Sequence, residues 1–456
     1  MNTELWDKIL NFDFDNPVSE YGFSTRLADE NFWTEDFTQK AIVEYKKFMY
    51  LAATSELMVS PSEIVDVVWH QHLIFTQSYQ DLCSLLGKQI QHIPSTHNKE
   101  EFQKFKQAKE RTKQSYLKNF GEQPVSIWAY ADMYESLHLN KAKIKIRMGI
   151  LLGILAFLIL VTPVYLLLKP IYITIDNPYF IIGLALLTIF TLISLEIFNR
   201  KRLRQIVHQF DKNSFIYFLQ PLELVYLKTQ KLSNVITGFT NELIDNGTIT
   251  VNTDYTMKMS GKGNTSSIEQ LQIMNTINSL GKTYYPALIR QLITKPLFRN
   301  TANCMYAFKK YFTKSKKFGT LFYINFSILS TLLMLAFIRL ITGILRDKPV
   351  IQIFIAIIII VITIVVYLNR LTKLICIQTI PDLYKKDILS PQQIEENWQW
   401  NYFLSGTAAL TPYFIPLVQY VKRSDSSSSS GGCGSSCGSS CGSSCGGSSC
   451  GGCGGH

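Results

Sequence analysis

The sequence lacks the short motifs that mark the best-known nucleotide-binding and hydrolytic sites. Its 456 residues contain no glycine-rich phosphate loop, no nucleophile elbow and no kinase signature. Cysteine is scarce before the end of the chain, because six of the nine cysteines lie beyond residue 432. Of the others, Cys83 follows His72 by eleven residues. In one continuous helix that spacing is about 16 Å, so we expect Cys83 to be a core residue and not part of a catalytic pair.

Charged residues are nearly absent from four apolar stretches, which are the most informative feature of the chain. The stretches cover residues 148–168, 179–198, 321–345 and 350–368. Each is long enough to cross the ~30 Å hydrocarbon layer as a helix that rises ~1.5 Å per residue. The sequence therefore predicts a multi-pass membrane anchor, with transmembrane helices 1 and 2 in residues 148–198 and helices 3 and 4 in residues 321–368.

Basic residues gather at only some ends of these stretches. They are Lys141, Lys143, Lys145, Arg147, Arg200, Lys201, Arg202, Arg204, Lys309, Lys310, Lys314, Lys316 and Lys317. Because basic flanks stay on the cytoplasmic side, they predict cytoplasmic N- and C-termini and a cytoplasmic central region, in the inner membrane of a bacterium. Residues 1–7 lack a basic start and an apolar run, so we expect no cleaved signal peptide. The net charge of +11 is then a topology signal, and no nucleic-acid partner is expected.

Few ionisable residues lie inside the apolar stretches. Arg339 lies about 9 Å from the outer end of its stretch, so we expect its side chain to reach interfacial water. Glu196 lies near the inner end of the second stretch and within reach of Arg200. No stretch carries two facing ionisable groups or a Gly/Pro break, so nothing indicates a transporter or a channel.

Residues 1–136 are polar, rich in aromatic residues and patterned for helices, which predicts an all-helical domain with its own core. Its best-defined helix is expected to begin with Ser60 as the N-cap and Pro61 in the first position, and to end at Gly87. The apolar residues of this helix recur at helical spacing: Ile64, Val68, Phe75, Tyr79, Leu82 and Leu86.

The same helix and the segment after it carry an unusual series of residue types. The series is Asp66-Val67-Val68-Trp69-His70-Gln71-His72, then Tyr79, Asp81, Cys83, Gly87 and His92-Ile93-Pro94. In these residues the chain resembles the glycine-rich-domain-containing-protein-like family, over about residues 30–128. The resemblance implies a helical domain without an established activity, and it supplies no reaction.

The histidines of this region raise the question of a metal site. His70 and His72 are two residues apart and point about 200° away from each other in a helix, so they cannot bind one ion together. Asp66 and His70 share a helix face and, with a returning His92, could hold zinc or another soft metal. In the alternative interpretation, His72 is a half-buried core residue, His92 anchors the loop before Pro94, and His70 only pairs with Asp66.

Residues 205–315 are expected to form a small cytoplasmic α+β domain. A helix from Pro221 to about Lys228, a second helix that ends at Asn246, and a hairpin in residues 248–259 follow in the order of a winged helix. The segment 221–249 also resembles an uncharacterised bacterial membrane-protein family whose members end in Gly/Cys-rich tails. The second helix has no basic residue after Lys231, so the sequence favours protein interaction or packing over DNA binding.

Residues 369–423 form a juxtamembrane region. Its apolar stretch, residues 413–420, is too short to span a bilayer and is expected to lie against the membrane or the central domain.

Residues 424–456 are almost entirely serine, glycine and cysteine, which predicts a disordered tail. Its candidate metal or thiol ligands are Cys433, Cys437, Cys441, Cys445, Cys450, Cys453 and His456. Cytoplasmic thiols are reduced, which argues against a disulfide framework. Three interpretations stay open: a soft-metal-binding or redox-responsive segment, a substrate for Cys/Ser modification as in azole-forming peptide precursors, and a spacer.

Together these patterns predict a mainly α protein that acts as a membrane-anchored scaffold or sensor. Its partners would be the lipid bilayer, a cytoplasmic protein and a soft metal ion on the tail. The alternative is a membrane-bound metal-dependent enzyme that uses Asp66, His70 and His92, although the sequence favours the first interpretation. Neither the substrate nor the oligomeric state follows from the sequence.

Overall fold

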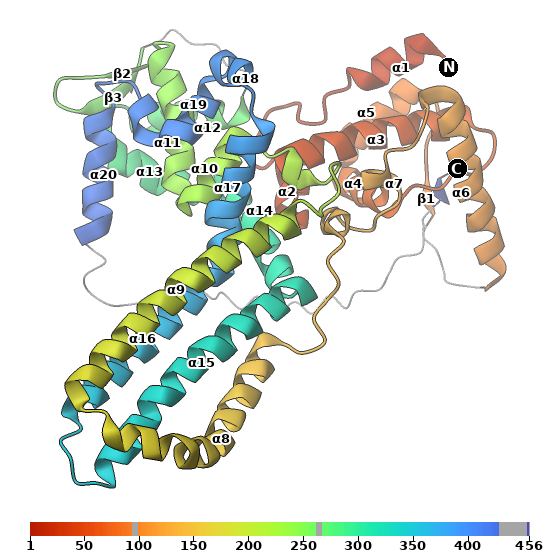
Figure 1. Cartoon of the computed structure of the whole chain (residues 1–456). Helices are drawn as coiled ribbons and strands as arrows, with labels where there is room; N and C mark the ends of the chain where they lie inside the picture. Colours follow the sequence, from red (N-terminus) through yellow and green to blue (C-terminus); the bar gives the residue numbers. More distant parts are fainter. Residues whose placement is uncertain (94–98, 261–266, 428–453, 456) are drawn as a thin grey trace. The chain divides into compact units, whose positions relative to one another are not determined.

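The computed structural model describes residues 1–93, 99–260, 267–427 and 454–455, and it is mainly helical (Figure 1). The chain divides into two compact units. Unit 1 consists of Met1–Ser136, Lys212–Met305 and Leu389–His456, and unit 2 consists of Leu137–Asp211 and Tyr306–Ile388. The apolar stretches therefore lie in one unit, and most of the polar sequence lies in the other.

The N-terminal part of unit 1 is built around one long helix, α3. Its elements are α1 (Thr3–Leu10), α2 (Phe23–Asn31), α3 (Glu35–Thr54), α4 (Glu63–Ile74), α5 (Thr76–Leu86), β1 (His92–Ile93), α6 (Lys99–Phe120), α7 (Val125–Trp128) and the 3-10 turn Met133–Leu137. Helices α1, α2, α4, α6 and α7 all contact α3. Aromatic residues fill the space between them, with Tyr45, Phe48 and Trp69 fully buried. This confirms that the N-terminal region is helical.

The helix that the sequence predicts between Ser60 and Gly87 is in fact two helices. The N-cap is Ser62, whose hydroxyl accepts a hydrogen bond from the backbone N–H of Val65, so Pro61 lies outside the helix. The chain breaks at Phe75, where ψ is 65° and the backbone N–H bonds the carbonyl of His72. The break leaves the apolar spacing unchanged, which is why periodicity does not reveal it.

The rest of unit 1 is a mixed region. Its elements are the 3-10 turn Phe215–Tyr217, α10 (Pro221–Thr229), α11 (Leu232–Asp245), β2 (Ile249–Val251), β3 (Thr256–Met259), α12 (Ile268–Leu280), β4 (Thr283–Tyr284), α13 (Tyr285–Leu292), α14 (Pro296–Thr313, which continues into unit 2), α18 (Pro391–Glu396), α19 (Trp398–Ser405), the 3-10 turn Gly406–Ala409, α20 (Ile415–Ser427) and β5 (Gly454–Gly455).

The predicted hairpin is confirmed, because β2 and β3 pair antiparallel with Ile249 opposite Met259, and β4 adds a third strand beside β3. The apolar residues before the tail pack on α13. The ring of Phe414 lies 4.9 Å from that of Tyr285, and Leu417 and Val418 are buried. The sequence allows residues 413–420 to lie against the membrane or against the central domain, and the structure places them against the central domain. Strand β5 pairs with β1, with Gly455 opposite His92.

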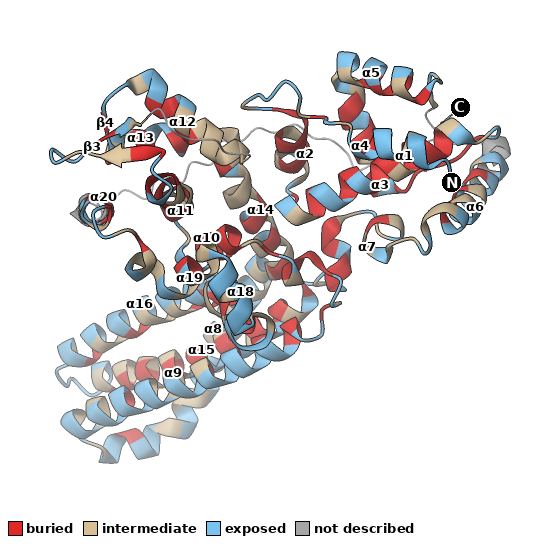
Figure 2. Cartoon of the chain, turned by 90° about the horizontal axis from the view of Figure 1, so that it is seen from above, coloured by how far each residue is buried: buried red, intermediate tan, exposed pale blue. Residues whose placement is uncertain are grey.

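Unit 2 contains the four membrane-length helices. These are α8 (Ile146–Thr174), α9 (Asn177–Val207), α15 (Lys316–Ile344) and α16 (Ile351–Leu374); the last continues through the π-helical turn Ile375–Thr379, α17 (Ile380–Leu383) and a second π-helical turn, Tyr384–Ile388. All four are apolar enough to cross a bilayer. They run side by side, with α15 in contact with α8, α9 and α16 (Figure 1). Their outer faces are exposed although they are apolar, as Leu158 and Phe190 illustrate, which is the surface that lipid would cover (Figure 2).

Close backbone approach joins α8 to α15. A Cβ atom on Gly149 would lie 2.2 Å from the ring of Tyr323, and one on Gly153 would lie 2.3 Å from the ring of Phe326. Small residues four apart let membrane helices approach in this way. The two glycines therefore make room for the aromatic rings of α15.

Polar groups inside the bundle are paired. Asn199 on α9 donates to Asn325 on α15 at 2.8 Å and to the hydroxyl of Tyr367 on α16 at 2.9 Å. Glu196 accepts hydrogen bonds from Arg200, as expected, and also from Arg370. The expectation for Arg339 is wrong, because its side chain is buried.

The guanidinium of Arg339 closes the turn between α8 and α9. It donates to the carbonyls of Tyr172 and Ile175 and to the side chain of Asn177, the last at 2.9 Å. The last carbonyls of a helix have no partner within it, so these groups offer an intramembrane cation better-placed acceptors than distant water.

Candidate metal centre

Two side chains of the candidate site come from one face of α4. Asp66 and His70 are one helical turn apart, and the Oδ2 atom of Asp66 lies 3.4 Å from Nε2 of His70. The side chain of Asp66 is only 10% exposed, whereas that of His70 is 54% exposed. Asp66 and His70 lie side by side, as their spacing predicts. The carboxylate of Asp66 is buried, however, whereas the imidazole of His70 faces solvent.

The third side chain arrives after the chain has reversed. Helix α5 ends at Gly87, whose φ of +66° lies in the left-handed region, and the following segment returns to α4. Nε2 of His92 then lies 3.2 Å from Oδ1 of Asp66, and the side chain of His92 is 9% exposed. The ring centroids of His70 and His92 are 4.3 Å apart. Ligand atoms of Asp66, His70 and His92 all lie within 4.8 Å of one another.

The returning segment is held by hydrogen bonds from Tyr79 and Lys88. The hydroxyl of Tyr79 donates to the carbonyl of Ile90, two residues before His92, and accepts a hydrogen bond from Nε1 of Trp69 at 3.1 Å. Lys88 donates to the carbonyls of Ala52 and Ser55 at the end of α3. The indole of Trp69 also packs against the ring of His92, with centroids 4.6 Å apart.

His72 takes no part in this cluster. It is fully buried, its Nδ1 lies 2.9 Å from the hydroxyl of Tyr45, and its Nε2 lies 3.1 Å from the hydroxyl of Ser78. Burial lowers the pKa of His72 to about 3, so its imidazole is neutral at physiological pH. As predicted, His70 and His72 do not belong to one site. His72 was expected to be half-buried and is fully buried.

The donor set fits a zinc-type ion. An ion that lies ~2.0–2.1 Å from tetrahedrally arranged ligands sets them about 3.3–3.4 Å apart. Asp66 has such separations with a different oxygen for each histidine, Oδ2 at 3.4 Å from His70 and Oδ1 at 3.2 Å from His92, and one ligand atom from each of the three residues lies within 4.8 Å of the others. Two imidazoles and one carboxylate are a common set for zinc and for non-haem iron, and both leave a position open. Without an ion, the Nε2–H tautomer of His92 can donate to Oδ1 of Asp66 at 3.2 Å.

An open concavity of about 730 Å³ adjoins the two histidines. It is lined by His70, Leu73, Thr76, Tyr79, Gln80, Gln89, Ile90, Gln91 and His92. Its volume lies in the range of small-molecule sites. Amide and hydroxyl groups supply hydrogen-bond donors and acceptors around the position that the three ligands leave open.

The sequence also predicts candidate ligands in the C-terminal tail. Cys433, Cys437, Cys441, Cys445, Cys450, Cys453 and His456 all lie outside the described residues. The three cysteines of the described part, Cys83, Cys304 and Cys376, are buried. Burial raises the pKa of the Cys304 thiol, and a buried neutral thiol is a poor nucleophile.

Comparison with known proteins supports a family relationship for part of the chain. Residues 20–119, which include α2 to α5 and the three candidate ligands, match the model of the uncharacterised family described as UCP032817-like. The comparisons with curated proteins and with solved structures gave no match. The matched segment therefore contains all three candidate ligands, Asp66, His70 and His92.

Proposed function

We propose that the chain is a membrane-anchored, metal-dependent enzyme whose divalent ion is held by Asp66, His70 and His92. The observation that carries this proposal is the convergence of the three ligand atoms within 4.8 Å of one another. The site also adjoins an open concavity, as a catalytic site must and a closed structural site need not.

The chemistry we propose is hydrolysis of a small polar substrate. A bound zinc-type ion supplies Lewis acidity and lowers the pKa of water that reaches its open position. The side chains of Thr76, Gln80 and Gln91 line the concavity and can hold a substrate by hydrogen bonds. Tyr79 fixes the segment that carries His92, so it is a positioning residue and not a ligand.

Metal analysis of the full chain in nanodiscs tests the proposal. The six tail cysteines are first replaced by serine, so that only the N-terminal site can retain a soft metal. This background should retain one zinc ion per chain after dialysis, and Asp66→Asn or His92→Gln should abolish retention. The matched control is His208→Gln, an exposed histidine of unit 2. Equal zinc contents in Asp66→Asn and the parent would refute the site.

The second candidate function is a metal-responsive scaffold or sensor, and one observation favours it. Strand β5, at the end of the Cys-rich tail, pairs with β1 so that Gly455 lies opposite His92. A tail that binds soft metal or a cytoplasmic partner through its thiols would then be coupled to the metal centre. In this case deletion of residues 424–456 should change zinc affinity at Asp66, whereas a pure enzyme site should be indifferent to the tail.

The orientation of the anchor is part of the proposal. The basic flanks support an inner-membrane protein of a bacterium with both termini in the cytoplasm. A membrane-impermeant maleimide added to intact cells should then leave Cys437 unlabelled, and label it after lysis. Labelling of Cys437 before lysis would show that the C-terminus lies outside the cytoplasm, which contradicts this orientation.

Two finer assignments belong with this proposal. The order α10, α11, β2, β3 supports a winged-helix-like module with a packing or protein-interaction role. The Trp-His-x-His series and the return to His92 support kinship with the glycine-rich-domain-containing-protein-like family.

A further inference from the structure

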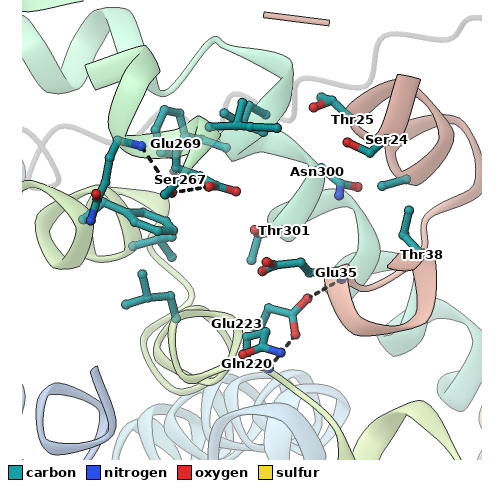
Figure 3. Close-up of a pocket in the computed structure, with 18 of the residues that line it drawn as sticks. Ser24, Thr25, Glu35, Thr38, Gln220, Glu223, Ser267, Glu269, Asn300 and Thr301 are labelled. Carbon is teal, nitrogen blue, oxygen red and sulfur yellow. Dashed lines mark hydrogen bonds between the residues drawn. The ribbon is translucent and has the colours of Figure 1, made fainter. Parts of the chain in front are cut away.

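A second concavity in unit 1, of about 430 Å³, is lined by acidic, hydroxyl and apolar side chains (Figure 3). Four glutamates line it: Glu35, Glu223, Glu242 and Glu269. Among the described residues that line it, none is Lys, Arg or His. The cavity is separate from the metal centre, since the two share no lining residue.

Three of the four glutamates already accept hydrogen bonds, Glu269 from the hydroxyl of Ser267 at 2.6 Å, and Glu35 does not (Figure 3). Glu223 accepts hydrogen bonds from the backbone N–H of Gln220 at 2.8 Å and of Glu35 at 3.2 Å. Glu242 accepts from the amides of Gln270 and Gln399. The carboxylate of Glu35 has no hydrogen-bond or ion-pair partner in the described part of the chain, and Figure 3 shows it pointing into the cavity.

The opposite wall presents polar groups that also lack partners. Ser24 and Thr25 on α2 are 8% and 6% exposed, and no other group in the described residues hydrogen-bonds their hydroxyls. The buried Oδ1 atom of Asn300 on α14 has no partner either. Figure 3 shows these three side chains directed at the cavity from one side. Buried polar groups are normally hydrogen-bonded, so these groups are available to a ligand in the cavity.

The electrostatics of the cavity select for a cation. Burial, reinforced by Glu269, Glu223 and Asp36, raises the pKa of Glu35 to about 8, and burial raises the pKa of Glu223 to about 7. Glu35 is therefore mostly protonated at pH 7, and a cation in the cavity would favour its charged form. The one nearby cation on the same helix, Lys40, is paired with Asp36 at 2.8 Å.

An anion is a poor occupant even though three helices begin at the cavity. Helix N-termini attract anions because their first N–H groups are unpaired. Here those groups are already used: Thr34 caps α3, Glu223 closes the capping box of α10, and Ser267 caps α12. These caps, together with the carboxylates that line the cavity, disfavour a phosphate or a carboxylate there.

We propose that this cavity binds a small aliphatic amine as its ammonium ion, with the charge on Glu35 and the alkyl chain against the apolar wall. A primary ammonium has three N–H donors, and the cavity offers it the carboxylate of Glu35 on one wall and the hydroxyls of Ser24 and Thr25 on the other (Figure 3). Leu222, Val235 and Phe298 supply the apolar wall. A diamine would place its second ammonium near Glu269.

The site would couple two parts of unit 1. Its lining comes from α2 and α3 of the N-terminal helices and from α10, α11, α12 and α14. An ammonium ion held by residues of both parts favours the arrangement in which they are together. The proposal does not depend on the metal centre, and a failure of one leaves the other intact.

Calorimetric titration of the full chain in nanodiscs with putrescine, n-butylamine and 1-butanol tests the proposal. Both amines should bind and the neutral, equally long alcohol should not. Glu35→Gln should weaken amine binding about tenfold or more, the loss expected for one charge-assisted contact. Thr25→Val, which keeps the side-chain shape, should weaken it less. Glu4→Gln, an exposed glutamate of α1 paired with Lys8, is the matched control and should change nothing.

The pH dependence of amine binding is a second test of the proposal. Glu35 must lose its proton to bind an ammonium ion, so amine affinity should rise between pH 6 and pH 8.5 in the parent and stay flat in Glu35→Gln. The groups that face Glu35 are Glu223, Glu269 and Asp36, all acidic. Equal affinity for butylamine and butanol, unchanged affinity in Glu35→Gln, or binding of Mg²⁺ in place of the amines would overturn the proposal.

Discussion

Nε2 of His92 lies 3.2 Å from Oδ1 of Asp66, although 26 residues separate the two along the chain. The contact exists because the chain breaks at Phe75, reverses at Gly87 and returns beside α4. His70 joins the pair from one turn along the same helix. A group of three neighbouring metal-ligand side chains thus results from one helix and one chain reversal.

Tyr79→Phe should weaken zinc binding about tenfold, the lower end of the range for residues that orient metal ligands. The change removes the hydrogen bonds to the Ile90 carbonyl and from Trp69 but keeps the ring in the core. Competition with a fluorescent zinc chelator, in the tail-serine background, measures the affinity. The control is Tyr21→Phe, because Tyr21 is exposed. An unchanged affinity would show that the loop holds His92 without Tyr79.

His72 should make unit 1 sensitive to acid. Its folded-state pKa of about 3 lies below the ~6.5 of an unfolded histidine, so the unfolded chain binds a proton that the folded chain excludes. The free energy of unfolding should therefore decrease as the pH falls from about 6.5 toward 3, by up to ~1.4 kcal/mol per pH unit.

His72→Gln should flatten this decrease, although it lowers stability at pH 7 because it disturbs the bonds to Tyr45 and Ser78. Urea titrations at pH 7, 6 and 5 with a chelator present, followed by tryptophan fluorescence, give the slopes. His70→Gln, on the exposed side of the same helix, is the control. Parallel slopes for the parent and His72→Gln would contradict the assignment.

Arg339→Met should destabilise the helix bundle by about 2–4 kcal/mol, because it leaves the buried carbonyls of Tyr172 and Ile175 without donors. Unfolding of unit 2 in mixed micelles with increasing SDS measures the effect. Arg346→Met is the matched control, since Arg346 is exposed and makes one long bond, 3.5 Å, to the carbonyl of Ile173. Equal losses in the two variants would mean that Arg339 acts only through its charge.

Asn199 and Asn325 should show an energetic coupling of about 0.6–1.7 kcal/mol, the range of hydrogen bonds between membrane helices. Each side-chain amide donates to the oxygen of the other at 2.8 Å. A double-mutant cycle with Asn199→Leu and Asn325→Leu, measured by the same SDS titration, isolates the pair. Strictly additive losses would indicate that Tyr367 or water satisfies each amide independently.

The four membrane-length helices were predictable because their signal is local. Length and hydropathy are properties of about twenty consecutive residues, so both can be determined without knowledge of the rest of the chain. The hairpin of β2 and β3 was predictable for the same reason, because alternation and the turn at residues 252–255 lie within one short segment. The pairing of Glu196 with Arg200 follows from their spacing of four in a helix.

The candidate metal site was only partly predictable. Helical spacing placed Asp66 with His70 and separated them from His72, and the structure has both features. Whether His92 returned to Asp66 depended on the turn at Gly87 and on the bonds of Tyr79 and Lys88, which link segments that are far apart in sequence.

The sequence by itself determined the four membrane-length apolar helices, the helical character of the N-terminal region and the pairing of neighbours one turn apart, since each depends on residues within a few turns of one another. Tertiary structure decided the burial of His72 and Arg339, the return of His92 and the acidic cavity around Glu35. These features depend on where distant segments meet and on how much water remains between them, and no local pattern specifies either.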